Sequence, residues 1–167
     1  MLYGSAELNG KNATDNVYLK YSDLGVTTFP FLAITDQFGI DNTFDGILGL
    51  SRQDKTYGNG PLFVEQAKLG GAITKEQVSF YMDKATGSNY VDVGAYTLSS
   101  VKGGSESDIT WINMPAEGFF WYSSAVQGIA IGDDSYTKTG RTARFMYGTD
   151  NQAPVIYDTG TSFIYAP

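Results

Sequence analysis

Short apolar stretches alternate with polar, glycine-rich turns along this chain. Residues 17–21 and 27–34 are rich in Val, Tyr, Thr, Phe and Ile, and they predict two strands separated by the polar turn 22–25. Short strands at such spacing, joined by Gly-containing turns, indicate an all-β sandwich or barrel. The further strands that the pattern predicts are 78–82, 90–93, 109–114, 119–122, 126–131, 144–147 and 155–157.

One segment has the pattern of a helix. Pro61 stands at its start, apolar residues recur at 62, 63 and 67, and Gly70 with Gly71 ends it, so a helix is predicted over 61–69. The apolar run 44–50 contains two glycines, which disfavour a helix there. Residues 74–77 have the form of a capping box, but the strand pattern that follows leaves room for one helical turn at most. Polar loops are predicted at 51–60, 83–89, 103–108 and 148–152.

Composition narrows the chemistry. The chain has no Cys and no His, which excludes zinc sites of the usual kind, thiol catalysis and Ser–His mechanisms. Carboxylates are then the main acid–base groups, with Lys and Tyr behind them, and no metal or cofactor is expected. A net charge of −7 would repel the backbone of nucleic acid, so no nucleic-acid partner is expected. No apolar stretch is long enough to predict a membrane span.

The most informative segment lies near the end of the chain. An apolar strand at 155–157 leads directly into Asp158-Thr159-Gly160-Thr161-Ser162. A carboxylate at a tight, Gly-containing turn after a buried strand is what half of a two-aspartate active site requires. Asp and Gly also favour turns for their own reasons, so an ordinary structural turn is the alternative.

Four blocks in order, which span nearly the whole chain, resemble the pepsin-like aspartic proteases. The resemblance implies an all-β, two-lobed fold, of which this chain would hold a part. The first block, 3–10, is similar to the flap hairpin, and the second, 44–50, reads Phe-Asp-Gly-Ile-Leu-Gly-Leu. The third block comprises 111–115, 118–121 and 128–132. The fourth, 156–162, is similar to Ile-Val-Asp-Thr-Gly-Thr-Ser.

By the family's layout, residues 1–90 would form the later part of the first lobe, including the flap, and 91–167 the first part of the second lobe, with the boundary between 80 and 107. The family has an Asp-Thr/Ser-Gly motif in each lobe, whereas this sequence contains one. We therefore expect an internal segment of a longer enzyme. Ala6 and Glu7 replace the Gly and Ser usual in the flap, and Gly94-Ala95 replaces a Gly-Gly pair.

The resemblance assigns roles to the second motif. Asp158 would be one catalytic carboxylate, Thr159 would tie the two active-site loops together, and Gly160 would let backbone approach the substrate. Thr161 and Ser162 would position loop and substrate, although Ser162 fits turn capping equally well.

The first two blocks would supply substrate-binding residues. Tyr3, with Gly4 and Ser5, would form the flap over the substrate; an ordinary strand Tyr is the alternative. Ile47 would line an apolar subsite or belong to the core, and Asp45 is expected to be a structural turn residue.

Together these features predict an aspartic endopeptidase that acts on polypeptides by a two-aspartate, water-activating mechanism and needs the remaining segments of the same protein. A pepsin-like fold without activity, serving as a binding module or as a structural fragment of a larger assembly, is the alternative. The family resemblance implies a secreted or lysosomal/vacuolar location. The sequon Asn12-Ala13-Thr14 can be used only on a secretory route.

Overall fold

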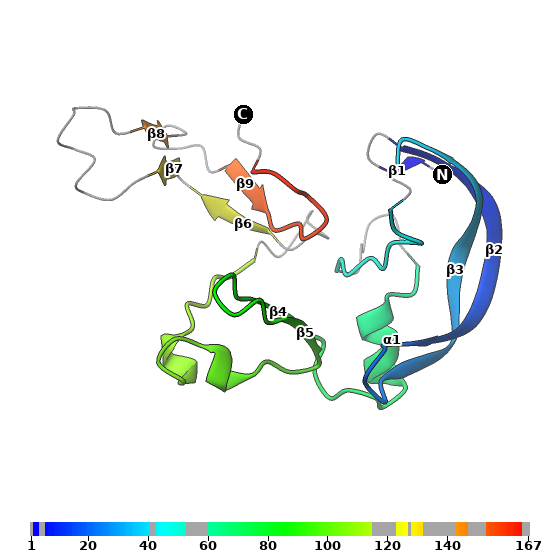
Figure 1. The fold of residues 1–167 in the computed structure, drawn as a ribbon, viewed down its shortest axis with the longest axis horizontal. Coiled ribbons are helices and arrows are strands. Elements are labelled where there is room, and N and C mark those ends of the chain that lie inside the picture. The colour runs from blue at the N-terminus through cyan, green and yellow to red at the C-terminus, as the bar shows by residue number, and fades with distance from the viewer. Residues whose placement is uncertain are drawn as a thin grey trace. The chain divides into compact units, whose positions relative to one another are not determined.

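The computed structural model describes residues 2–3, 6–40, 43–52, 60–114, 123–126, 128–131, 143–146 and 153–164 (Figure 1). Contacts group the chain into two units, Met1–Leu50 with Asn59–Ile109, and Ser51–Gly58 with Thr110–Pro167. Antiparallel strands dominate the described parts of both units, which confirms the predicted all-β class. The lobe boundary predicted between 80 and 107 stays a prediction.

A long curved hairpin dominates the first unit (Figure 1). Strands β1 (Leu2–Tyr3), β2 (Ala6–Tyr18) and β3 (Gly25–Phe38) form an antiparallel sheet in that order. The strand predicted at 17–21 is therefore misplaced, because β2 ends at Tyr18 and begins far earlier. Leu19 closes the turn instead, since its backbone N–H donates to the carbonyl of Leu24 at 3.0 Å.

The β2–β3 pairing has two register shifts, one between Asn9 and Gly10 and one between Asp15 and Val17. At the second shift, Asn16 Oδ1 accepts a hydrogen bond of 3.0 Å from the backbone N–H of Thr28. Thr28 has φ +55, which is unusual for a β-branched residue. The Asn16 side chain thus satisfies a backbone donor where the ladder is interrupted.

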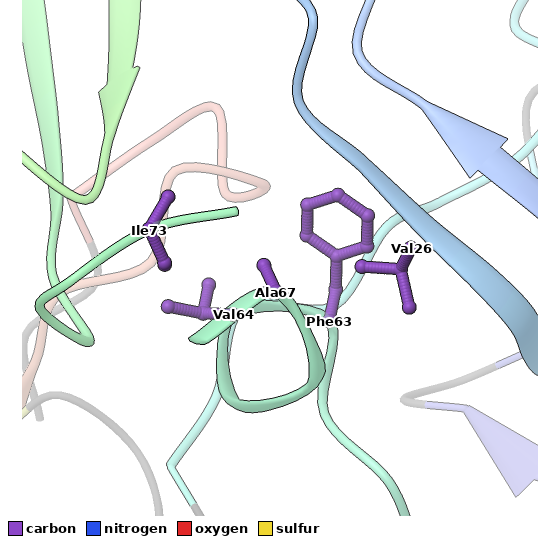
Figure 2. Packing of buried hydrophobic residues seen from close by; sticks show 5 residues of the cluster. All are labelled: Val26, Phe63, Val64, Ala67 and Ile73. Carbon is purple, nitrogen blue, oxygen red and sulfur yellow. The ribbon is translucent and has the colours of Figure 1, made fainter. Parts of the chain in front are cut away.

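Helix α1 (Phe63–Leu69) confirms the predicted helix and carries most of the buried core. Figure 2 shows Phe63 pointing toward Val26 of β3, while Val64 and Ala67 face Ile73. Phe63 is 1% exposed, and its ring meets the ring of Phe29 edge-on with centroids 5.8 Å apart. The helix is therefore held by its apolar face rather than by propensity, as expected for so short a helix.

A second hairpin, β4 (Val78–Met82) with β5 (Asn89–Val93), agrees with the predicted strands. The helical turn considered for 74–77 is absent there. A capping box instead stands at the 3-10 helix η2 (Glu106–Asp108), where Ser105 accepts from the N–H of Ser107 and donates its own N–H to Asp108. A further 3-10 helix, η1, spans Leu98–Ser100.

In the described residues of the second unit there are two strand pairs, β6 (Ser123–Val126) with β9 (Ala153–Ile156) and β7 (Gly128–Ile131) with β8 (Ala143–Met146). The strand predicted at 126–131 is thus mostly β7, and those at 144–147 and 155–157 agree within two residues. The strand predicted at 109–114 is wrong: this segment is irregular, and Trp111 is 66% exposed. Predictions for 119–122 and 148–152, and for most of the loop 51–60, lie outside the described residues.

Candidate active site

The Asp-Thr-Gly turn follows directly from the sheet. Ile156, the last residue of β9, pairs with Ser123 of β6, and the chain then leaves the ladder at Tyr157. The turn closes where the N–H of Thr161 donates to the carbonyl of Asp158 at 3.3 Å. An antiparallel pair therefore fixes the point from which the Asp158 side chain is presented.

Both oxygens of the Asp158 carboxylate accept hydrogen bonds from within the turn. The Thr161 hydroxyl donates to Oδ2, and the Gly160 N–H donates to Oδ1 at 2.9 Å. These bonds, that from Thr161 above all, lower the pKa of Asp158 below its usual value, against a smaller opposing effect of burial. The turn thus favours the ionised carboxylate on an exposed residue.

Gly160 lies close to the carboxylate it serves. A Cβ at this position would lie 3.2 Å from Asp158 Oδ1, tighter than ordinary van der Waals contact. A side chain at this position would therefore crowd Oδ1. The bond itself does not need a glycine, because Ala85 donates the matching bond to Asp83 Oδ1 at 2.8 Å. The substrate approach that the sequence suggested for Gly160 stays a prediction.

Thr159 and Ser162 are both exposed, and no hydrogen bond of either side chain to another described residue is found. The loop-tying role expected of Thr159 and both readings of Ser162 stay predictions.

The flap residues are only partly described. Tyr3 ends β1 and pairs with Ala6 at the start of β2, so the two strands run antiparallel on either side of Gly4 and Ser5. Gly4 and Ser5 themselves lie outside the described residues, and only the backbone of Tyr3 is described. The pairing agrees with a hairpin at this place, whereas the substrate-binding role of Tyr3 stays a prediction.

Ile47 lies in an irregular segment that is not helical, as predicted for 44–50. Its side chain is 51% exposed, so Ile47 is not a core residue of the first unit. Asp45 is also exposed. Tyr3 and Ile47 belong to the first unit and Asp158 to the second, so their joint role in one site stays a prediction.

A second aspartate turn has the same hydrogen bonds, and the sequence interpretation missed it. Asp83 Oδ1 accepts from the N–H of Ala85 at 2.8 Å, and the Thr86 hydroxyl donates to Asp83 Oδ2. The Thr86 bond is again the main cause that lowers the pKa of this aspartate. The shared signal is an Asp followed three residues later by Thr. These hydrogen bonds are therefore a property of the turn and do not by themselves mark a catalytic aspartate. What distinguishes Asp158 from Asp83 is the Thr-Gly-Thr-Ser that follows it.

No cluster of acidic side chains suited to a metal ion occurs among the described residues. In the same part of the chain, no helix is both long and apolar enough to cross a membrane.

The strand-rich fold and an Asp-Thr-Gly turn after a paired strand together define an aspartyl protease-like chain. A comparison with known families finds a match to the eukaryotic aspartyl proteases over residues 1–167. The chain belongs to this family, and the predicted pepsin-like resemblance is confirmed. No curated protein and no solved structure matches the chain.

Proposed function

We propose that the protein is an endopeptidase in which Asp158 is one of two aspartates that activate water against a peptide bond. The observation that carries this is the place of Asp158: an exposed carboxylate inside Asp-Thr-Gly-Thr-Ser, directly after a paired strand, in a chain of the eukaryotic aspartyl protease family. Family membership supports peptide hydrolysis as the reaction, and this sequence context supports Asp158 as the residue.

The mechanism needs a second carboxylate close to Asp158. Two such groups within a few Å do not both ionise readily, so they share a proton and titrate as a pair. The ionised member takes a proton from water, while the protonated member donates to the scissile carbonyl, as in aspartic proteases generally. The hydrogen bonds from Thr161 and Gly160 lower the pKa of Asp158 in the absence of its partner, and we propose that Asp158 is the member that accepts the proton.

The second carboxylate would come from another segment of the same two-lobed protein. The printed sequence contains Asp-Thr-Gly at 158–160 and no other Asp-Thr-Gly or Asp-Ser-Gly. We therefore expect a further Asp-Thr/Ser-Gly in the parent protein. For the same reason the 167-residue segment by itself should hydrolyse no peptide, because Asp158 would lack a partner with which to share a proton.

The substrate would be a polypeptide with bulky apolar side chains next to the cleaved bond. Ile47 and Leu48 are 51% and 41% exposed, so apolar surface is available in the segment that the resemblance assigns to a subsite. Tyr3 would close over such a substrate from the flap. We also propose a secreted or lysosomal/vacuolar location, which the family resemblance implies.

The test is hydrolysis of a peptide library by the full-length protein between about pH 2 and 7, which brackets the titration of carboxyl groups. In heavy-oxygen water, one labelled oxygen should enter the new carboxyl group of the product, and added nucleophiles should trap no acyl-enzyme. A peptide analogue of the tetrahedral hydrate should inhibit. Binding of peptides without any cleavage would instead identify the inactive binding module.

A further inference from the structure

We propose that Asn12 is an N-glycosylation site, which carries a glycan on the outer face of the β2–β3 hairpin. Asn12-Ala13-Thr14 is the only Asn-x-Ser/Thr triplet in the printed sequence, and its middle residue is not Pro. Such triplets arise by chance, so the case depends on where the fold places this one.

The two side chains that the glycosylating enzyme must reach are both free. Asn12 and Thr14 are exposed on β2, and they lie two residues apart in an extended strand, so both side chains project from the same face. Neither side chain has a hydrogen bond to a described residue. By contrast, Ala6 and Leu8, which project from the same face earlier in β2, are each only 3% exposed. The sequon therefore lies beyond the buried part of this face.

Helix α1 covers the other face of the hairpin. Asp15 pairs with Phe29, and the Phe29 ring packs on Phe63 of α1 with centroids 5.8 Å apart. Thr14 pairs with the adjacent residue Pro30, and neighbouring residues of a strand point to opposite faces. A glycan on the Asn12 face would thus leave the contact between Phe29 and Phe63 undisturbed.

The neighbours of Asn12 across the ladder are apolar. Gly10, Asn12 and Thr14 pair with Ile34, Leu32 and Pro30, respectively. None of these three β3 side chains can accept a hydrogen bond from the Asn12 amide, and Ile34 is 44% exposed. A glycan at this place would shield an apolar row, exposed at Ile34 and Pro30 and half-buried at Leu32, with a bulky, solubilising group.

The reaction transfers a preassembled oligosaccharide from a polyprenyl diphosphate carrier of the secretory pathway. The Nδ2 of Asn12 forms a bond to C1 of the first sugar, the bond from C1 to the carrier's phosphate oxygen breaks, and polyprenyl diphosphate leaves. Nδ2 gives up one proton, so no oxidant or reductant is needed. The proposal rests on a secretory route and is independent of the catalytic role proposed for Asp158.

The test is to express the full-length protein from its own coding sequence in a eukaryotic cell. Treatment with a peptide N-glycosidase in heavy-oxygen water should shift its mobility and convert Asn12 to a labelled Asp in the peptide mass spectrum. Asn12→Gln and Thr14→Ala should each abolish both the mobility shift and the labelled Asp at residue 12. Thr14→Ser keeps the sequon, so both signals should remain. Asn9→Gln, an exposed change on the same strand outside the sequon, is the matched control and should retain both signals as well.

Glycosidase treatment that leaves Asn12 of the wild-type protein unconverted, whether the protein is secreted or intracellular, would overturn the proposal. A mobility shift that persists in Asn12→Gln would overturn it as well. Circular dichroism of each variant checks that loss of the label does not come from misfolding. If the glycan covers the apolar row, its enzymatic removal should also raise the binding of an apolar dye, and Ile34→Thr should reduce that rise.

Discussion

The hydroxyl of Thr161 donates a hydrogen bond to Oδ2 of Asp158, and this bond is the main cause that lowers the pKa of the carboxyl. The donor comes from the turn itself, so its position follows from the local sequence. An exposed aspartate is thereby kept ionised further into the acidic range than an isolated one.

The bond between Thr161 and Asp158 has a counterpart outside the proposed site. Thr86 bonds Asp83 in the same way, at the same spacing and with the same direction of pKa change. Asp83 lies between β4 and β5 in the first unit, without the Thr-Gly-Thr-Ser that follows Asp158. The chain thus contains its own control for each experiment on Asp158.

Replacement of Thr161 by Val should raise the pKa of Asp158. The substitution removes the hydroxyl that stabilises the charged form, so a smaller fraction of Asp158 is ionised at a given acidic pH. If ionised Asp158 accepts the proton from water, the acidic limb of kcat/KM for the full-length protein should move to higher pH. The measurement is the pH–rate profile of both proteins on one peptide substrate.

The matched control is Thr86→Val, which removes the same kind of bond from Asp83. The acidic limb of kcat/KM against pH for Thr86→Val should coincide with that of the wild type. An unchanged limb in Thr161→Val, or an equal movement in both variants, would contradict the assignment of that limb to Asp158.

Phe63→Ala should destabilise the first unit by about 3–5 kcal/mol, because it empties the centre of the core. The side chain is 1% exposed and touches both the β3 strand and its own helix neighbours. Leu69→Ala on the same helix is the control, since Leu69 is 74% exposed and should change stability by less than about 0.5 kcal/mol. Urea unfolding followed by circular dichroism measures both, and similar losses in the two variants would contradict the core described above.

Gly94→Ala should lower the free energy of unfolding more than Gly104→Ala does. Both glycines have positive φ, +85 and +76, so each alanine would carry backbone strain of roughly 1–2 kcal/mol. A Cβ at Gly94 would also lie 2.6 Å from Ile73 Cγ2, whereas nothing lies within 4 Å at Gly104. The overpacking at Gly94 should lower the free energy of unfolding by about a further 1–3 kcal/mol. Equal losses in the two variants would argue against the Gly94–Ile73 contact.

A bulky apolar residue next to the cleaved bond should raise kcat/KM about ten- to a hundredfold over a small one, since burying such a side chain stabilises by roughly 1.5–3 kcal/mol. Ile47→Asp in the full-length protein should reduce that preference, because a carboxylate would stand at the apolar subsite. Peptide-library cleavage by both proteins measures it. A preference for charged residues in the wild type would reject the placement of Ile47 in the cleft.

Local signals in the sequence were sufficient for the elements that depend on local physics. Pro61 and Gly70 frame α1, and of the predicted apolar positions the core uses Phe63 and Ala67, whereas Leu62 precedes the helix and the buried Val64 is not among them. The same holds for β4 and β5, which join through the polar turn at Asp83. In each case turn chemistry and apolar spacing favour the same structure.

Long-range pairing could not be predicted from the same signals. The first half of β2 contains Asn9, Gly10 and Asn12, which favour turns, yet pairing with β3 holds it extended. Conversely, Trp111 and Ile112 have strand-like side chains but lie in irregular backbone. The sequence identified Asp158 as the candidate catalyst, but the hydroxyl of Thr161 on its carboxylate became visible only with the turn in three dimensions.

The most direct test of the catalytic role of Asp158 is the kcat of Asp158→Asn in the full-length protein, measured beside Asp83→Asn. The amide matches the carboxylate in size but cannot take a proton from water. We predict that kcat falls by about 100-fold or more in Asp158→Asn, with KM changed far less, and that Asp83→Asn stays near the wild type. A kcat for Asp158→Asn within about tenfold of the wild type would contradict the account.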